Sequence, residues 1–223
     1  LESLAKGFFS MADEFAVELV GGDTTRGSLN ICVQIMGETD RDKALRRDRA
    51  TAGDIIWISG ELGAAALALA HLQGQIPLPA QALVRCAARL HNPSPRVALG
   101  LALQGIAQSA IDISDGLVGD LGHILSCSDV AGKIHLDRIP CAPDLLPHLD
   151  GLPGKQMMLA GGDDYELCFT APASYTQAIN DIALQLKLPL TAIGESVSGS
   201  GLIILDDRDR PLNLHLKSFD HFA

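Results

Sequence analysis

Apolar residues recur at intervals of three and four from Leu1 to Phe15, a spacing that predicts one face of an amphipathic helix. Because this pattern is already under way at Leu1, we expect the chain to begin inside a folded unit, as an N-terminally truncated protein would. Comparable apolar patterns continue further along the chain. They predict helices over residues 62–73, 79–90, 95–108, 117–125 and 174–186.

Other stretches have the two-residue period of a strand. In residues 29–35 every second side chain is apolar, which predicts a strand with one buried face. The run over residues 55–59 is apolar on both sides and predicts a buried strand. Shorter strands are expected at residues 110–113, 133–137, 165–170, 191–194 and 202–205. This order of short strands and helices predicts an α+β fold whose antiparallel or mixed sheet carries helices on one face.

A charged segment over residues 38–53 separates two parts of the chain. Its density of acidic and basic residues is typical of a solvated connection between folded units. We therefore predict a first unit over residues 1–37, a charged linker over 38–53 and a C-terminal α+β domain over 54–223. Arg46, Arg47 and Arg49 all lie in this linker, and the pattern alone does not favour one of them as a ligand.

Composition narrows the function classes. The chain has 223 residues, of which 47% are hydrophobic, enough to bury a substantial core. Seventeen basic against 27 acidic residues give a net charge of −10, which argues against a broad nucleic-acid-binding face and fits either solubility or metal-bridged anion chemistry. Five cysteines without C-x-x-C spacing argue against a disulfide framework or a zinc site, so a reducing cytoplasm is expected. The most apolar stretch is far too short to span a bilayer, so no membrane partner is expected.

The most informative segment is Ile-Asp-Ile-Ser-Asp-Gly over residues 111–116, which reads as a strand, a turn and the start of a helix. Asp112, Ser114 and Asp115 would then lie near the positive end of the helix dipole. Two carboxylates with a hydroxyl between them suit Mg²⁺, which completes its coordination with water and phosphate oxygens. The alternative is that Asp115 only caps the helix and Asp112 only ends the strand.

Two further loops combine glycine with acidic residues. Residues 21–27 read Gly-Gly-Asp-Thr-Thr-Arg-Gly, where the glycines allow close approach to a ligand and Asp23 can bind a metal; a polar hairpin loop is the alternative. In the second loop Gly161 and Gly162 form a turn with Asp163 and Asp164 at its tip. Three such loops, without a Ser-His-Asp set, favour metal-assisted chemistry on an anionic ligand.

Taken together, the motifs resemble the thiamine-monophosphate kinase family, within the aminoimidazole ribonucleotide synthetase-like superfamily. The resemblance covers essentially the whole chain. It rests on residues 21–27, Arg47, residues 112–117 with 120–123, residues 161–169 and the Phe-Asp-His-Phe tail over 219–222.

The resemblance implies ATP-dependent phosphorylation of thiamine monophosphate to thiamine diphosphate, with Mg²⁺, in a homodimer joined through N-terminal-domain sheets. Residues 1–37 would be the remnant of the ATP-binding and dimerisation domain, so we expect the full-length protein to be the kinase and this fragment to be inactive. Transfer between two phosphates needs no covalent nucleophile, so no catalytic side chain is assigned.

Site residues follow position by position from the resemblance. Gly22, Asp23, Arg47 and Ser114 would contact ATP; Asp23, Asp112 and Asp115 would bind metal; and Asp163 and Phe219 would face the thiamine substrate. Asp163 stands where the family has Glu, and Phe219 where it has Tyr or Trp. A stacked thiazolium would suit an aromatic face at Phe219, whereas the alternative is an aromatic that anchors the tail.

Two other functions remain open from the sequence. One is a sister ATP-using enzyme of the same superfamily, because the nucleotide-side motifs can be shared. The other is a non-catalytic nucleotide-binding or assembly module whose first strand pairs with another copy.

Overall fold

A computed structural model describes residues 1–214 and residue 216, and the chain divides into two units, Leu1–Asp40 and Arg41–Ala223. The first unit contains α1 (Glu2–Glu14), as the apolar spacing predicts, followed by chain without helix or strand. The strand expected over residues 29–35 is therefore wrong. Its apolar side chains are exposed, and no strand of the described residues supplies the hydrogen-bonding partner that an isolated extended segment needs.

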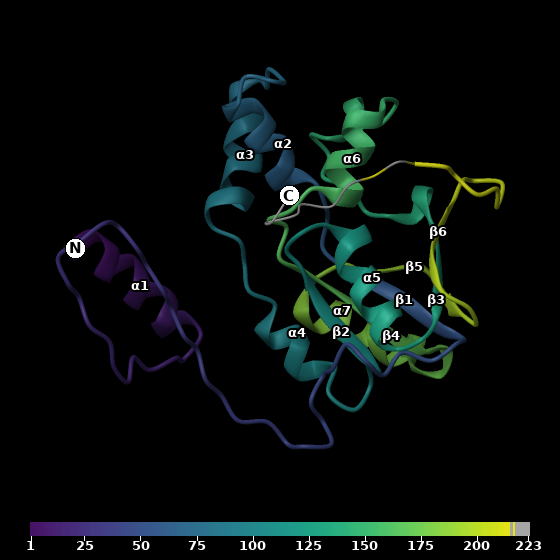
Figure 1. Cartoon of the computed structure of the whole chain (residues 1–223), viewed down its shortest axis with the longest axis horizontal. Coiled ribbons are helices and arrows are strands. Elements are labelled where there is room, and N and C mark those ends of the chain that lie inside the picture. The colour runs from purple at the N-terminus through teal and green to yellow at the C-terminus, as the bar shows by residue number, and fades with distance from the viewer. Residues whose placement is uncertain (215, 217–223) are drawn as a thin grey trace. The chain divides into compact units, whose positions relative to one another are not determined.

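The second unit is built on a six-stranded sheet in the order β2-β4-β1-β5-β3-β6. All neighbouring strands are antiparallel except β3 and β6, which are parallel, so the predicted mixed sheet and α+β class are confirmed. The strands are β1 (Asp54–Ser59), β2 (Ser109–Ile113), β3 (Ala131–His135), β4 (Glu166–Pro172), β5 (Leu190–Val197) and β6 (Gly201–Leu205). The helices are α2 (Ala64–Leu72), α3 (Ala80–His91), α4 (Val97–Ala102), α5 (Leu117–Cys127), α6 (Leu152–Ala160) and α7 (Thr176–Leu186) (Figure 1).

Helices cover both faces of this sheet, where the sequence led us to expect one. Side chains of a strand alternate between faces, and β1 shows the consequence. Ile56 and Ile58 belong to a core with α2, α5 and α6, whereas Trp57 belongs to a second core with α4 and α7. Trp57 stacks there against Phe169, with ring centroids 6.3 Å apart.

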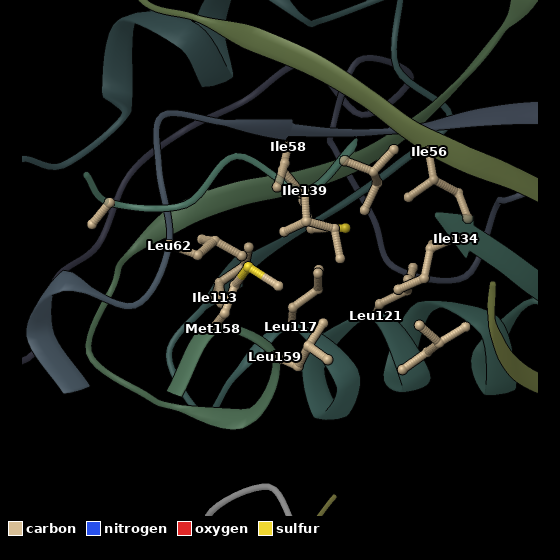
Figure 2. Packing of buried hydrophobic residues seen from close by; sticks show 14 of the residues in the cluster. Ile56, Ile58, Leu62, Ile113, Leu117, Leu121, Ile134, Ile139, Met158 and Leu159 are labelled. Atoms are coloured by element: carbon tan, nitrogen blue, oxygen red, sulfur yellow. The ribbon is translucent and has the colours of Figure 1, made fainter. Parts of the chain in front are cut away.

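The larger core fixes the position of α5. Leu117 and Leu121 project from α5 toward Ile56, Ile58 and Ile113 of the sheet, and Figure 2 shows these side chains packed together. All five are fully buried. Since α5 begins directly after β2, this packing holds the turn between them at one edge of the sheet.

Candidate functional site

The turn after β2 and the loop before β4 meet at the same edge of the sheet. The two strands pair antiparallel, with Asp112 opposite Leu167 and Ile113 opposite Glu166. The end of β2 therefore lies beside the start of β4. Two of the three acidic loops singled out in the sequence, separated by about 45 residues, are brought together in this way.

Backbone hydrogen bonds join the two loops. The N–H of Asp163 donates to the carbonyl of Ser114 at 2.9 Å, and the N–H of Tyr165 donates to the carbonyl of Ile113 at 2.8 Å. Gly162 is required here because a Cβ at this position would lie 2.5 Å from the Ser114 carbonyl oxygen. Asp163 and Tyr165 also have positive φ angles of 67° and 50°, a conformation that costs non-glycine residues energy and often marks functional sites.

Acidic side chains converge near the hydroxyl of Tyr165. This hydroxyl donates to Oδ1 of Asp163 at 3.3 Å. Burial, followed by the negative charges of Asp163, Asp112 and Asp115, raises the pKa of Tyr165. The charges of Asp112, Asp115 and Asp163 thus act on one side chain, that of Tyr165.

The start of α5 is fixed by Asp120, not by a capping side chain. Neither Ser114 nor Asp115 caps the helix: its N-cap is Gly116, and no side chain makes a cap hydrogen bond. Instead, Oδ2 of Asp120 accepts the N–H groups of Ser114 and Asp115, each at 3.0 Å. Burial, opposed by the bond from Asp115, raises the pKa of Asp120. The alternative role of Asp115 as a simple cap is therefore wrong.

The donor set of this turn fits a hard divalent cation. Asp112 is exposed, and Asp115 and Ser114 are half-buried. Mg²⁺ is commonly held by one or two carboxylates together with substrate phosphates and waters. Within residues 1–214 and 216, no group of three or more His, Cys, Asp or Glu side chains is arranged to hold a metal on its own. The turn can therefore offer two carboxylates and a hydroxyl. The remaining ligands of such a cation would be waters and the phosphate oxygens of a bound ligand.

Arg47 lines an open groove beside this turn. The groove has a volume of about 500 Å³ and is lined by Leu45, Arg46, Arg47, Asp48, Ala110, Ile111, Asp112 and Cys127. It forms because the N–H of Ala110 donates to the carbonyl of Arg46 at 3.0 Å, which places the charged segment along the edge of β2. The guanidinium of Arg46 is held by Asp48. The geometry thus places Arg47 and Asp112 on one groove.

A second polar cluster, which the sequence analysis missed, lies on the buried side of the loop that precedes β4. Glu166 is fully buried and accepts hydrogen bonds from Ser59, at 2.6 Å, and from the guanidinium groups of Arg89 and Arg96. Both oxygens of Asp164 lie 3.0 Å from the N–H of Gly63, at the start of α2. Burial raises the pKa of Asp164 to about 7. These contacts join positions 70 to 107 residues apart, so no local pattern reveals them.

The remaining predicted residues belong to other parts of the chain. Gly22 and Asp23 belong to the first unit, where Oδ1 of Asp23 accepts the N–H of Thr24 at 2.7 Å. Phe219 lies outside the described residues. Their roles stay predictions.

Comparisons with known proteins point to one family, although no family model matches the chain. The thiamine-monophosphate kinase of Escherichia coli K12 is 39% identical over 229 residues, which cover all of this chain and 69% of that protein. The thiamine-monophosphate kinase of Haemophilus influenzae is 36% identical with the same coverage. The chain thus spans about two thirds of the length of these relatives.

Comparison with solved structures gives the same family. The crystal structure of thiamine-monophosphate kinase from Stenotrophomonas maltophilia has a TM-score of 0.83 and 43% identity, over 91% of this chain and 66% of that one. AaThiL, solved in complex with AMPPCP and TMP, has a TM-score of 0.66 and 28% identity, over 80% of this chain and 54% of that one. The hydrogenase maturation protein HypE of E. coli, at 17% identity and a TM-score of 0.58, shares the fold alone, the aminoimidazole ribonucleotide synthetase-like fold. From the identity and coverage of its relatives, the chain belongs to the thiamine-monophosphate kinase family.

Proposed function

We propose that this protein transfers the terminal phosphoryl group of ATP to thiamine monophosphate in a Mg²⁺-dependent reaction. The observation that carries the proposal is the junction of the Asp112–Asp115 turn with the loop of Asp163, through hydrogen bonds of 2.9 and 2.8 Å, in a chain of this family. Support for ATP and thiamine monophosphate as the reactants comes from AaThiL, which was solved with AMPPCP and TMP.

Each residue has a separate task in this proposal. Asp112 and Asp115 would hold Mg²⁺, which supplies charge neutralisation between the phosphates. Ser114 and Arg47 would bind ATP phosphate or ribose oxygens along the groove, and Asp163 would orient the thiamine substrate. A phosphate oxygen of thiamine monophosphate forms a bond to the terminal phosphorus, while the bond from that phosphorus to the bridging oxygen of ADP breaks. No protein nucleophile takes part, and the products are ADP and thiamine diphosphate.

The roles of the first unit belong to the same proposal. Gly22 and Asp23 would meet ATP and a metal ion. The apolar side chains of residues 29–35, exposed within this unit, would pack against a second copy in a homodimer. Sedimentation analysis tests the dimer: a protein that remains monomeric at micromolar concentration would contradict this part.

Among the described residues, no helix has the length and apolar character needed to cross a bilayer. The five free cysteines fit a cytoplasmic location.

The reaction is tested with a coupled assay of ADP release by the natural protein. We expect release that requires both thiamine monophosphate and Mg²⁺, and a loss of at least about 100-fold in kcat/KM for Asp112→Asn, because its carboxylate is proposed to hold the metal. Asp181→Asn, a substitution of an exposed carboxylate on α7, is the control and should leave the rate unchanged. ADP release that is independent of thiamine monophosphate would contradict the proposal.

A further inference from the structure

We infer that Asp120 is a positioning residue that holds the 112–115 turn in the geometry needed to bind Mg²⁺ and nucleotide. This inference deepens the proposed function and rests on it. It concerns a side chain that the site assignments above do not include.

The first argument is the pair of hydrogen bonds. Oδ2 of Asp120 accepts the backbone N–H groups of Ser114 and of Asp115, both at 3.0 Å. The backbone N–H of Asp120 also donates to the carbonyl of Gly116 at 3.0 Å. Side chain and backbone of one residue therefore hydrogen-bond to backbone groups of three consecutive residues, Ser114, Asp115 and Gly116.

The second argument is burial. Only 3% of Asp120 is exposed, whereas Asp112 is exposed and Asp115 half-buried. Asp120 therefore lies beneath the turn and contacts its backbone, while Asp112 and Asp115 carry the carboxylates that can reach a ligand. Hydrogen bonds from backbone N–H groups to a buried carboxylate are among the stronger ones in proteins.

The third argument is the geometric demand of the cation. Mg²⁺ requires near-ideal octahedral coordination with short bonds, so small displacements of its carboxylates weaken binding. Loss of an outer residue that orients metal ligands typically costs 10- to 100-fold in affinity or activity. Removal of the Asp120 carboxylate frees two amides of the turn, and the spacing between Asp112 and Asp115 is no longer fixed.

The matched control is Asp54. It is also buried, with 2% exposed, and its Oδ2 accepts a backbone N–H, that of Thr51, at 2.8 Å. Asp54 pairs with Pro172, at the end of β4 opposite to the site. Substitution of Asp54 therefore removes a comparable buried hydrogen bond without touching the turn.

The test compares Asp120→Ala and Asp120→Asn with Asp54→Ala and Asp54→Asn in the 223-residue chain. Mn²⁺ binding in the presence of AMPPCP is measured by electron paramagnetic resonance, and amide exchange of residues 114 and 115 by mass spectrometry. We expect Asp120→Ala to weaken Mn²⁺ binding at least about tenfold and to accelerate exchange at these amides. Asp120→Asn should show a smaller effect, because its Oδ1 can still accept both N–H groups. Both Asp54 variants should bind Mn²⁺ as the unmodified protein does.

Equal Mn²⁺ binding by Asp120 and Asp54 variants would overturn the inference, as would unchanged exchange at residues 114 and 115. If Asp120→Ala does not fold, Asp120→Asn decides, since it should still bind Mn²⁺ at least threefold more weakly than Asp54→Asn. Turnover of thiamine monophosphate by the unmodified protein is recorded separately. Its absence would contradict the proposed function, whereas the metal and exchange measurements report on Asp120 itself.

Discussion

The buried carboxyl of Asp164, in the loop before β4, should make the stability of the protein depend on pH. Substitution of Asp164 by Asn should remove this dependence. Asp164 is 7% exposed, and burial, reinforced by the charge of Glu166, raises its pKa from 3.8 to about 7. The hydrogen bond from Gly63 and the charge of Arg89 oppose this rise. In the unfolded chain the carboxyl titrates near its ordinary value.

The direction and the size of this pH dependence follow from the linkage between proton binding and folding. Because the folded state binds the proton more tightly, Asp164 stabilises the fold fully below about pH 4, and this contribution is lost as the pH rises through about 7. A pKa difference of about 3 units at about 1.4 kcal/mol per unit amounts to about 4 kcal/mol. The free energy of unfolding of the unmodified protein should fall by this amount, relative to Asp164→Asn, between pH 4 and pH 8.

Urea unfolding followed by tryptophan fluorescence measures this difference directly. Trp57 is the only tryptophan and is buried in the second unit, so its signal reports the unit that contains Asp164. Contributions of the other titratable groups cancel in the comparison of the two proteins at each pH. A difference that stays constant from pH 4 to pH 8, or that changes in favour of the unmodified protein as pH rises, would refute the reasoning.

Three further substitutions test the packing around the site. Arg96→Met leaves the fully buried carboxylate of Glu166 with one guanidinium fewer and should lower the free energy of unfolding by about 3 kcal/mol in urea, and an unchanged midpoint would contradict the ion pair. Leu121→Ala opens a cavity between α5 and the sheet and should cost about 2–5 kcal/mol in the same assay. Gly116→Ala puts a Cβ 2.6 Å from Cα of Ala160, at a residue whose φ of 108° strains any side chain. Calorimetry should therefore show AMPPCP binding weakened at least about tenfold. Full affinity would mean that the turn tolerates the strain.

The parts of the fold that could be predicted from sequence are those with a long local period. The spacing of apolar residues in α1 and α5 matches one helical face, whereas α2 is predicted by its richness in alanine and leucine; the structure confirms all three helices. The segment over 29–35 has an equally clear strand period, but a strand also needs a partner, which a local pattern does not supply. The helix expected over 95–108 ends at Ala102, because the chain must turn there to enter β2.

Helix α6 was missed because its first turn contains Pro153 and Gly154, two residues that usually interrupt helices. Proline is favourable in the first turn, where its missing N–H has no partner to lose. Glycine is required at position 154 because a Cβ there would lie 2.0 Å from the carbonyl oxygen of His148. Pro153 is thus explained by its place in the first turn, and Gly154 by a close backbone contact that the sequence does not display.

In the candidate site, too, local motifs could be read from the sequence, whereas contacts between distant residues could not. Short motifs singled out Asp112, Ser114, Asp115 and Asp163, because glycine and carboxylates at close spacing are visible in any sequence, and the roles given to these residues stay predictions. The bonds of Asp120 to the turn were not foreseen, since its position on the helix resembles that of an ordinary surface residue. The pairing of Glu166 with Arg89 and Arg96 depends on which helices pack against β4, so only the folded chain reveals it.

The central claim is tested most directly by identifying the product. The natural protein is incubated with ATP, thiamine monophosphate and Mg²⁺, and the reaction is followed by phosphorus NMR. The account predicts thiamine diphosphate and ADP in equal amounts, with neither formed when Mg²⁺ is removed by chelation. ADP accompanied by inorganic phosphate, or thiamine monophosphate left unchanged while ATP is consumed, would contradict it.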